Sequence, residues 1–129
     1  MKKTHLIFGL LIVFVFLLTG QYMEYVHNRT LADGVRVLYR SRHIYILFNA
    51  LINITLGLYV QYAVAGWRRS LQLIGSILIM IAPVFLLVGF FYEPPRGADQ
   101  TKIAPYGIFA TAIGVLLHLL SAGRKRVSE

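Results

Sequence analysis

Arginine and histidine side chains gather at one point of this sequence, where they could bind an anion. Arg36, Arg40, Arg42 and His43 lie close together, and the spacing of Arg36, Arg40 and His43 places all three on one face of a helix. A guanidinium group donates two hydrogen bonds in a planar fork that suits phosphate and carboxylate groups. The pattern predicts either ordinary contacts with lipid headgroups or a specific site for a lipid phosphate or an acidic partner.

Polar residues recur every four positions in the stretch that follows. Tyr45, Asn49 and Asn53 lie one helical turn apart from each other. An asparagine that faced lipid would lose its water partners without replacement, so these side chains should face protein or a wet cavity. We expect either a hydrogen-bonded seam or a polar cavity for a small solute or ion.

Small and polar residues share one face of the last apolar stretch. They follow a spacing of four and three in heptad register, which covers Gly107, Thr111, Gly114, His118 and Ser121. Small residues let membrane helices approach closely, and hydroxyl and imidazole groups can bond across the contact. The pattern predicts a helix-packing seam made by Gly107, Ala110, Gly114 and Ser121, or else a pathway lined by Thr111 and His118.

Signatures of catalysis and of metal binding are missing from the sequence. The chain has no cysteine, which removes thiolate metal sites and cysteine nucleophiles. The five acidic residues lie between the apolar stretches or in the tail, so no embedded carboxylate can couple to a proton or orient a base. Paired histidines on facing helices could hold a haem, but none of the four lies deep in an apolar stretch. We therefore expect a non-enzymatic protein with no cofactor and no metal.

Four long apolar stretches must position all of these side chains. They cover roughly residues 5–23, 43–65, 71–92 and 103–122, and each is long enough to cross a hydrocarbon layer of ~30 Å as a helix. Charged residues make up only 14% of the chain, against about 25% in soluble domains. The sequence predicts an all-α membrane protein with a single transmembrane domain over residues 1–129. Its helices should cover about 5–23, 34–65, 71–92 and 103–122, with short loops and a basic interfacial extension at the start of helix 2.

Turn residues and prolines predict where the helices begin and bend. Asp33 is placed to cap the start of the second helix. Pro83, near the middle of the third helix, predicts a kink and a free backbone carbonyl one turn earlier, near Ile79. Pro105 lies in the first turn of the last helix, where proline is tolerated.

The net charge of +8 comes from basic residues that flank the apolar stretches, so it indicates lipid headgroups and topology and not nucleic acid. Four crossings place both termini on one side, with seven basic residues there and six on the other side. The seven lie in short segments, which favours cytoplasmic termini. The start of the chain is similar to a bacterial signal peptide without a good cleavage site, so we expect a retained helix in a multi-pass protein of the bacterial inner membrane.

The favoured hypothesis is a small non-enzymatic integral membrane protein. It would pack with copies of itself or with a larger membrane complex through the small-residue face, and it would engage an anionic lipid or partner through the basic face. A channel or transporter for small solutes or anions, lined by the asparagines, is the alternative. A haem- or quinone-linked membrane anchor subunit that uses histidine ligands is the least favoured hypothesis.

Overall fold

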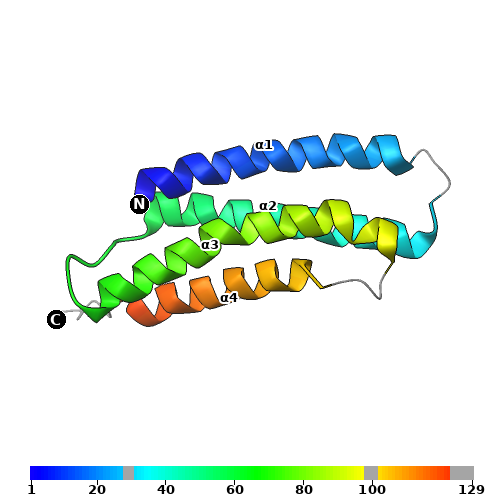
Figure 1. Cartoon of the computed structure of the whole chain (residues 1–129). Helices are drawn as coiled ribbons and strands as arrows, with labels where there is room; N and C mark the ends of the chain where they lie inside the picture. Colours follow the sequence, from blue (N-terminus) through cyan, green and yellow to red (C-terminus); the bar gives the residue numbers. More distant parts are fainter. Residues whose placement is uncertain (28–30, 98–101, 123–129) are drawn as a thin grey trace, which may run out of the picture.

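The described part of this chain forms four helices and one short 3-10 turn, as seen in a computed structural model (Figure 1). The structure describes residues 1–27, 31–97 and 102–122, and this part of the chain contains no strand. The elements are α1 (Lys2–His27), α2 (Asp33–Tyr59), α3 (Trp67–Tyr92), η1 (Pro94–Arg96) and α4 (Ala104–Ser121). The prediction of an all-α fold with four helices is confirmed.

The helices lie side by side as two hairpins (Figure 1). α1 packs along α2, α3 packs along α4, and contacts between α2 and α3 join the two hairpins. The start of α1 and the end of α4 lie at one end of the bundle, which we call the terminal end. The chain passes from α1 to α2 and from α3 to α4 at the opposite end, which we call the loop end.

Three of the helices are long and apolar enough to cross a membrane. These spans are Lys2–Tyr25, Trp67–Tyr92 and Ala104–Ser121. α2 falls outside this group because it carries three arginines and two asparagines among its apolar residues. The sequence prediction of membrane-spanning helices is therefore supported for α1, α3 and α4.

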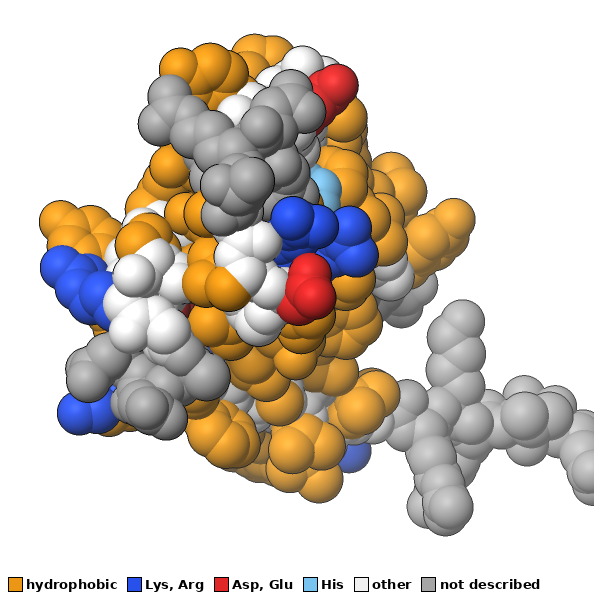
Figure 2. Space-filling view, turned by 90° about the vertical axis from the view of Figure 1, so that its right-hand side faces the viewer, with side chains coloured by type: hydrophobic (Ala, Val, Ile, Leu, Met, Phe, Trp, Pro, Cys, Tyr) orange, Lys and Arg blue, Asp and Glu red, His pale blue; other side chains and the backbone are white. Residues whose placement is uncertain are grey.

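Polar side chains fill much of the interior, and large apolar side chains cover the outside. Phe14, Phe48 and Leu120, from three different helices, are 60%, 58% and 68% exposed. Figure 2, which looks onto the loop end, shows many hydrophobic side chains on the surface around the bundle. A water-soluble domain has the opposite distribution. The buried polar residues are His5, Thr19, Arg42, Asn49, Asn53, Gln72, Ser76, Glu93, Thr111, His118 and Ser121.

The second helix ends earlier than the sequence indicated. α2 stops at Tyr59 and not at residue 65, and the chain is extended at Val60. Gln72 of α3 explains the early end because it binds the backbone of the connection. Its Oε1 accepts the N–H of Ala63 over 2.7 Å, and its Nε2 donates to the carbonyl of Gln61 over 3.1 Å. These bonds replace those of a further helical turn.

The bounds of α1, the start of α3 and the cap of α2 also differ from the prediction. α1 covers Lys2–His27 and not 5–23. α3 begins at Trp67, four residues before the predicted start at 71. Asp33 is the first residue of α2 and Ala32 precedes it as the N-cap, with no side-chain capping bond, so the predicted cap is wrong. Pro105 does lie in the first turn of α4, as predicted.

Candidate functional site

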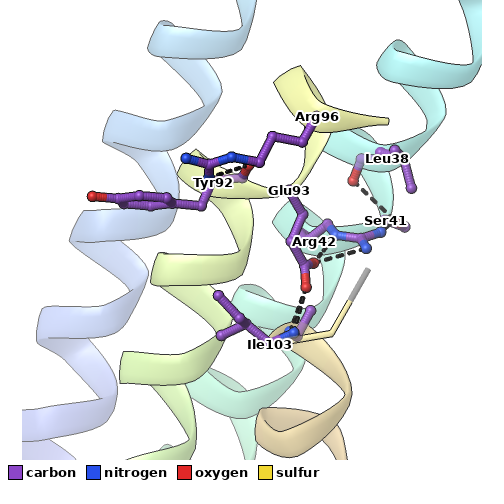
Figure 3. A network of polar contacts seen from close by, with 8 residues as sticks. Leu38, Ser41, Arg42, Tyr92, Glu93, Arg96 and Ile103 are labelled. Carbon is purple, nitrogen blue, oxygen red and sulfur yellow. Dashed lines mark hydrogen bonds and ion pairs between the residues drawn. The ribbon is translucent and has the colours of Figure 1, made fainter. Parts of the chain in front are cut away.

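Arg42 of α2 and Glu93, which follows α3, form a buried ion pair at the loop end (Figure 3). Nη2 of Arg42 lies 2.8 Å from Oε2 of Glu93, and Nε of Arg42 donates to the same oxygen over 2.9 Å. The two side chains are only 5% and 1% exposed. Because a buried charge without its counter-charge is costly, each residue requires the other, and α2 is fastened to the end of α3.

The other carboxylate oxygen of Glu93 holds the start of α4. Oε1 accepts hydrogen bonds from the backbone N–H groups of Ile103 and Ala104, the latter over 3.0 Å. The first N–H groups of a helix have no partner within it, so the carboxylate satisfies them. Burial alone would raise the pKa of the Glu93 carboxyl, but the bonds from Ala104, Ile103 and Arg42 together outweigh burial and lower that pKa below its ordinary value. Glu93 thus joins three helices.

The structure separates the residues of the predicted anion site. Arg42 is buried in the ion pair, whereas Arg40 is exposed and Arg36 is partly exposed. Nη1 of Arg36 lies 3.8 Å from Oδ1 of Asp33, a weak surface pair. Figure 2 shows Lys and Arg side chains beside an acidic side chain at this end of the bundle. Of the three arginines of the predicted site, Arg36 and Arg40 therefore keep a guanidinium group available to an anion.

His43, the fourth predicted member, lies against α1. Its Nδ1 is 3.0 Å from Oγ1 of Thr19, and its ring stacks on Phe16 with 3.9 Å between the ring centroids. The imidazole therefore belongs to the contact between α1 and α2 and is separate from the exposed arginines.

Asn49 occupies the centre of the bundle and is fully buried. Its Nδ2 donates to the carbonyl of Ile79 over 3.2 Å and to Oγ1 of Thr111 over 2.9 Å. The carbonyl of Ile79 is free because Pro83, four residues later in α3, has no N–H. α2 therefore bonds to α3 at the point where proline interrupts the hydrogen bonds of α3, and it bonds to α4 through the same amide.

Asn53 extends this network toward the terminal end. Its Nδ2 donates to the backbone carbonyl of Asn49 over 3.0 Å and to Oδ1 of the same residue over 2.9 Å. Its Oδ1 lies 2.7 Å from Nδ1 of His5, a residue of α1 that is completely buried. All four helices thus share one polar network, to which α3 contributes the carbonyl freed by proline.

His118 of α4 lies next to this network. Its Nε2 is 3.1 Å from Oγ of Ser76, and that hydroxyl is 2.9 Å from the hydroxyl of Tyr62. The rings of His5 and His118 have centroids 6.4 Å apart, so these two side chains meet across the two hairpins. Among the described residues, three buried side-chain atoms have no hydrogen-bond partner: His5 Nε2, His118 Nδ1 and, at the loop end, Nε of the partly exposed Arg36.

The predicted polar seam is thus brought together in part. Asn49, Asn53 and Thr111 are joined by direct hydrogen bonds, and His118 joins the same region beside His5. Tyr45 is 36% exposed and lies instead in an apolar groove between α2 and α4. The groove has a volume of about 680 Å³, and it opens because α2 and α4 make few contacts.

Apolar side chains separate the asparagine network from the ion pair at the loop end. Ile46, Leu86 and Phe90 are at most 1% exposed and belong to the hydrophobic core. A channel for small solutes or anions along the bundle would require these three side chains to move. The polar residues therefore form two separate groups and not one continuous path.

The small-residue face of α4 packs against α3 of the same chain. A Cβ atom added at Gly114 would lie 2.5 Å from Cγ1 of Ile79 and 2.7 Å from the carbonyl oxygen of Gly75. A Cβ at Gly107 would lie 2.9 Å from the carbonyl oxygen of Ala82. The face is therefore occupied within the chain. Its buried members are Gly107, Thr111, Gly114, His118 and Ser121, with Ala110 half-buried beside them.

Three residues of these sites are not predicted by the sequence patterns. The sequence places Glu93 between two apolar stretches, and no spacing distinguishes Ser76 or Tyr62. The position of Glu93 directly before two prolines was the available signal, because a carboxylate between a helix end and the next helix start can satisfy free N–H groups.

Comparisons with protein-family models, with curated proteins and with solved structures find no match to this chain.

Proposed function

We propose that this chain is a small, non-enzymatic integral membrane protein whose four helices all cross the bilayer, and that its exposed arginines at the loop end hold anionic lipid headgroups. One observation carries the proposal: polar side chains lie inside the bundle and large apolar side chains lie outside. Hydrocarbon as the surrounding solvent accounts for this distribution, because lipid chains accept apolar side chains and cannot satisfy polar ones.

The crossing of α2 is supported by the places where its polar side chains go. Arg42, Asn49 and Asn53 are buried and bonded to other helices, so none of them meets lipid. The outward residues of its second half include Phe48, Leu51 and Leu58, which are all more than half exposed. At ~1.5 Å per residue the helix is long enough to span ~30 Å.

The test of four crossings is a thiol-accessibility experiment, which the absence of native cysteine makes clean. Ala32→Cys lies before α2 and Val64→Cys lies after it. In intact bacterial cells, a membrane-impermeant maleimide should label only the first variant, and labelling of both should require broken cells. Labelling of both thiols from the same side would contradict the crossing of α2.

The proposed orientation has cytoplasmic termini. Lys2, Lys3, Arg68 and Arg69 are exposed at the terminal end. Arg42 is one of the six basic residues that the sequence analysis counted on the side opposite the termini. It is buried in an ion pair and contributes nothing to a basic loop. Removing it widens the difference in basic residues between the two ends, in the direction that the positive-inside rule favours.

Arg36 and Arg40 are the proposed headgroup ligands. They are one turn apart on α2, at the end of the bundle where headgroups would lie. Two forked guanidinium groups at this spacing suit a phosphodiester, and each basic residue near an anionic surface contributes about 1 kcal/mol. Gly107 and Gly114 are packed against α3 and Ser121 is buried, so we propose that association with a second copy or a larger membrane complex uses another face of the bundle.

The lipid test compares two double variants. Native mass spectrometry of the protein released from mixed vesicles should show retained phosphatidylglycerol in preference to phosphatidylcholine. R36Q/R40Q should lose that preference, whereas R68Q/R69Q, which removes two exposed arginines from the terminal end, should keep it. Equal losses in both variants would overturn the assignment to Arg36 and Arg40, because general attraction of basic residues to headgroups would then suffice.

A further inference from the structure

Two histidines from different hairpins meet inside the terminal half of the bundle. His5 of α1 is fully buried, and His118 of α4 is 7% exposed. The ring centroids are 6.4 Å apart and the ring planes are inclined by 78°. Each ring has one nitrogen with a hydrogen-bond partner and one buried nitrogen with none, His5 Nε2 and His118 Nδ1.

The protonation of His5 follows from its partner. Both hydrogen bonds from the side-chain nitrogen of Asn53 go to Asn49, one of them to a backbone carbonyl, so the amide orientation is fixed. Oδ1 of Asn53 therefore accepts, and Nδ1 of His5 carries the hydrogen. Nε2 is left with a free lone pair in the interior.

His118 is also held at one nitrogen, and its Nδ1 has a free lone pair in the tautomer in which Nε2 donates to the serine. Its Nε2 lies against the hydroxyl of Ser76, which also contacts the hydroxyl of Tyr62. Its Cδ2 faces α3, where a Cβ added at Gly75 would lie 3.1 Å away. Nδ1 is on the opposite edge of the ring from Cδ2, so it is directed away from α3.

Rings held by one nitrogen and open at the other are typical of metal ligands. A histidine that binds a metal almost always donates its second N–H to an oxygen, which fixes the tautomer and the ring orientation. Two buried nitrogens without partners cost about 1–3 kcal/mol each, and one metal ion would satisfy both. A metal bound in line between two imidazole nitrogens, ~2.0 Å from each, separates the centroids by about 6 Å.

The class of ion follows from the number of ligands. No group of three or more His, Cys, Asp or Glu side chains that could hold a metal occurs in the described residues, so a divalent ion such as zinc would lack its usual four ligands. A monovalent d10 ion such as Cu(I) accepts two ligands in line, and it brings the smallest charge into an interior where charge is costly. We propose that His5 Nε2 and His118 Nδ1 form a two-imidazole site for a monovalent d10 cation such as Cu(I).

A pocket of about 580 Å³ at the terminal end offers an approach to this site. Lys2, Gln61 and Tyr62 are among its lining residues. Tyr62 belongs to both the pocket and the site, because its hydroxyl bonds the serine that holds His118. An ion would therefore enter from the terminal end, past the ring of Tyr62.

The experiment is an anaerobic titration of the whole protein in mild detergent with Cu(I), in competition with a chromophoric Cu(I) chelator. We expect one Cu(I) per chain. His5→Gln and His118→Gln should each weaken binding by at least about 100-fold, and Asn53→Ala, which only orients His5, should weaken it by about 10- to 100-fold. His43→Gln is the matched control, because that imidazole packs on Phe16 away from the pair, and it should bind as the wild type does.

X-ray absorption at the copper edge of the wild type keeps the proposal testable if a variant fails to fold. Two nitrogen neighbours at ~2.0 Å and no sulfur are expected. Four neighbours, a sulfur ligand, equal affinity for zinc, or no uptake of Cu(I) at all would each overturn the proposal. The last result would assign the space between the two rings to a bridging water.

Discussion

The two ends of the bundle bury polar groups in different ways. At the loop end, the charged side chains of Arg42 and Glu93 bind each other, and both carboxylate oxygens accept hydrogen bonds. At the terminal end, the rings of His5 and His118 each leave one buried nitrogen without a partner. A buried charge must be paired because exposing it to an apolar interior costs several kcal/mol, whereas an open nitrogen costs about 1–3 kcal/mol. The loop end is therefore built for fastening, and the terminal end leaves room for a ligand.

The asparagine network between the two ends is closer in kind to the loop end. Asn49 and Asn53 donate through both of their amide nitrogens to atoms of three helices. Hydrogen bonds of this sort, within an apolar surrounding, fix how helices are rotated relative to each other. Among the described residues, the open nitrogens of the two histidines are the buried side-chain atoms without a partner, apart from Nε of the partly exposed Arg36.

The largest expected effect comes from breaking the loop-end pair. Glu93→Gln keeps an oxygen for the N–H groups of α4 but leaves Arg42 buried without a counter-charge. The free energy of unfolding should fall by about 3–5 kcal/mol. Denaturant titration in detergent, followed by circular dichroism of the helices, measures this change.

The double variant R42M/E93Q is the control for that experiment. It removes both charges and keeps the apolar length of the arginine side chain, so it should recover most of the stability lost in E93Q. A double variant as unstable as the single one would show that the buried charge is not the cause, and the comparison between the two ends would fail.

A second substitution tests whether the small-residue face of α4 serves the chain itself. Gly114→Leu forces side-chain atoms against Ile79 and the backbone of Gly75, and it should cost about 1–3 kcal/mol through displacement of α4 from α3. Ala112→Leu, on the exposed side of the same helix, should stay within about 0.5 kcal/mol of the wild type. Loss of an oligomer by G114L with unchanged helix stability would place this face between chains instead.

A double-mutant cycle tests the bond between Asn49 and the carbonyl that Pro83 frees. Asn49→Ala should cost about 1–3 kcal/mol, because buried acceptors lose their donor. In the Pro83→Ala background residue 83 can donate to Ile79, so the same change should cost at least about 0.5 kcal/mol less. Equal costs in both backgrounds would show that the freed carbonyl does not depend on Asn49.

The inward direction of the asparagines and the free carbonyl at Ile79 could be predicted from the sequence, because each follows from local chemistry. An amide in an apolar stretch must find protein, and a proline four residues later must free a carbonyl. The amide of Asn49 reaches the carbonyl of Ile79 because of the way α2 packs against α3. The spacing of residues along the chain does not contain that information.

The anion site shows a different limit. Arg40 and Arg42 are two residues apart, which places them about 200° apart around a helix, so one of them had to turn inward if the other faced out. Helical geometry thus separates them, since the face predicted for Arg36, Arg40 and His43 leaves Arg42 out. The partner Glu93, 51 residues later, could not have been found in that way, because only the fold of the two hairpins brings it beside Arg42.

The smallest expected effect is a pH dependence that belongs to the loop end alone. The pKa of Glu93 is lower in the folded protein than its ordinary value of 4.5, so the unfolded chain takes up this proton first as the pH falls. The stabilisation is complete above the ordinary value, and it is lost as the pH decreases through 4.5 toward the lowered pKa of the folded state. Unfolding titrations of the wild type from about pH 7 to pH 3 should therefore show a decline in stability that E93Q lacks. Parallel curves for the two proteins would mean that the ion pair with Arg42 does not hold the carboxylate in its charged form, and the contrast between a fastened end and an open end would lose its electrostatic basis.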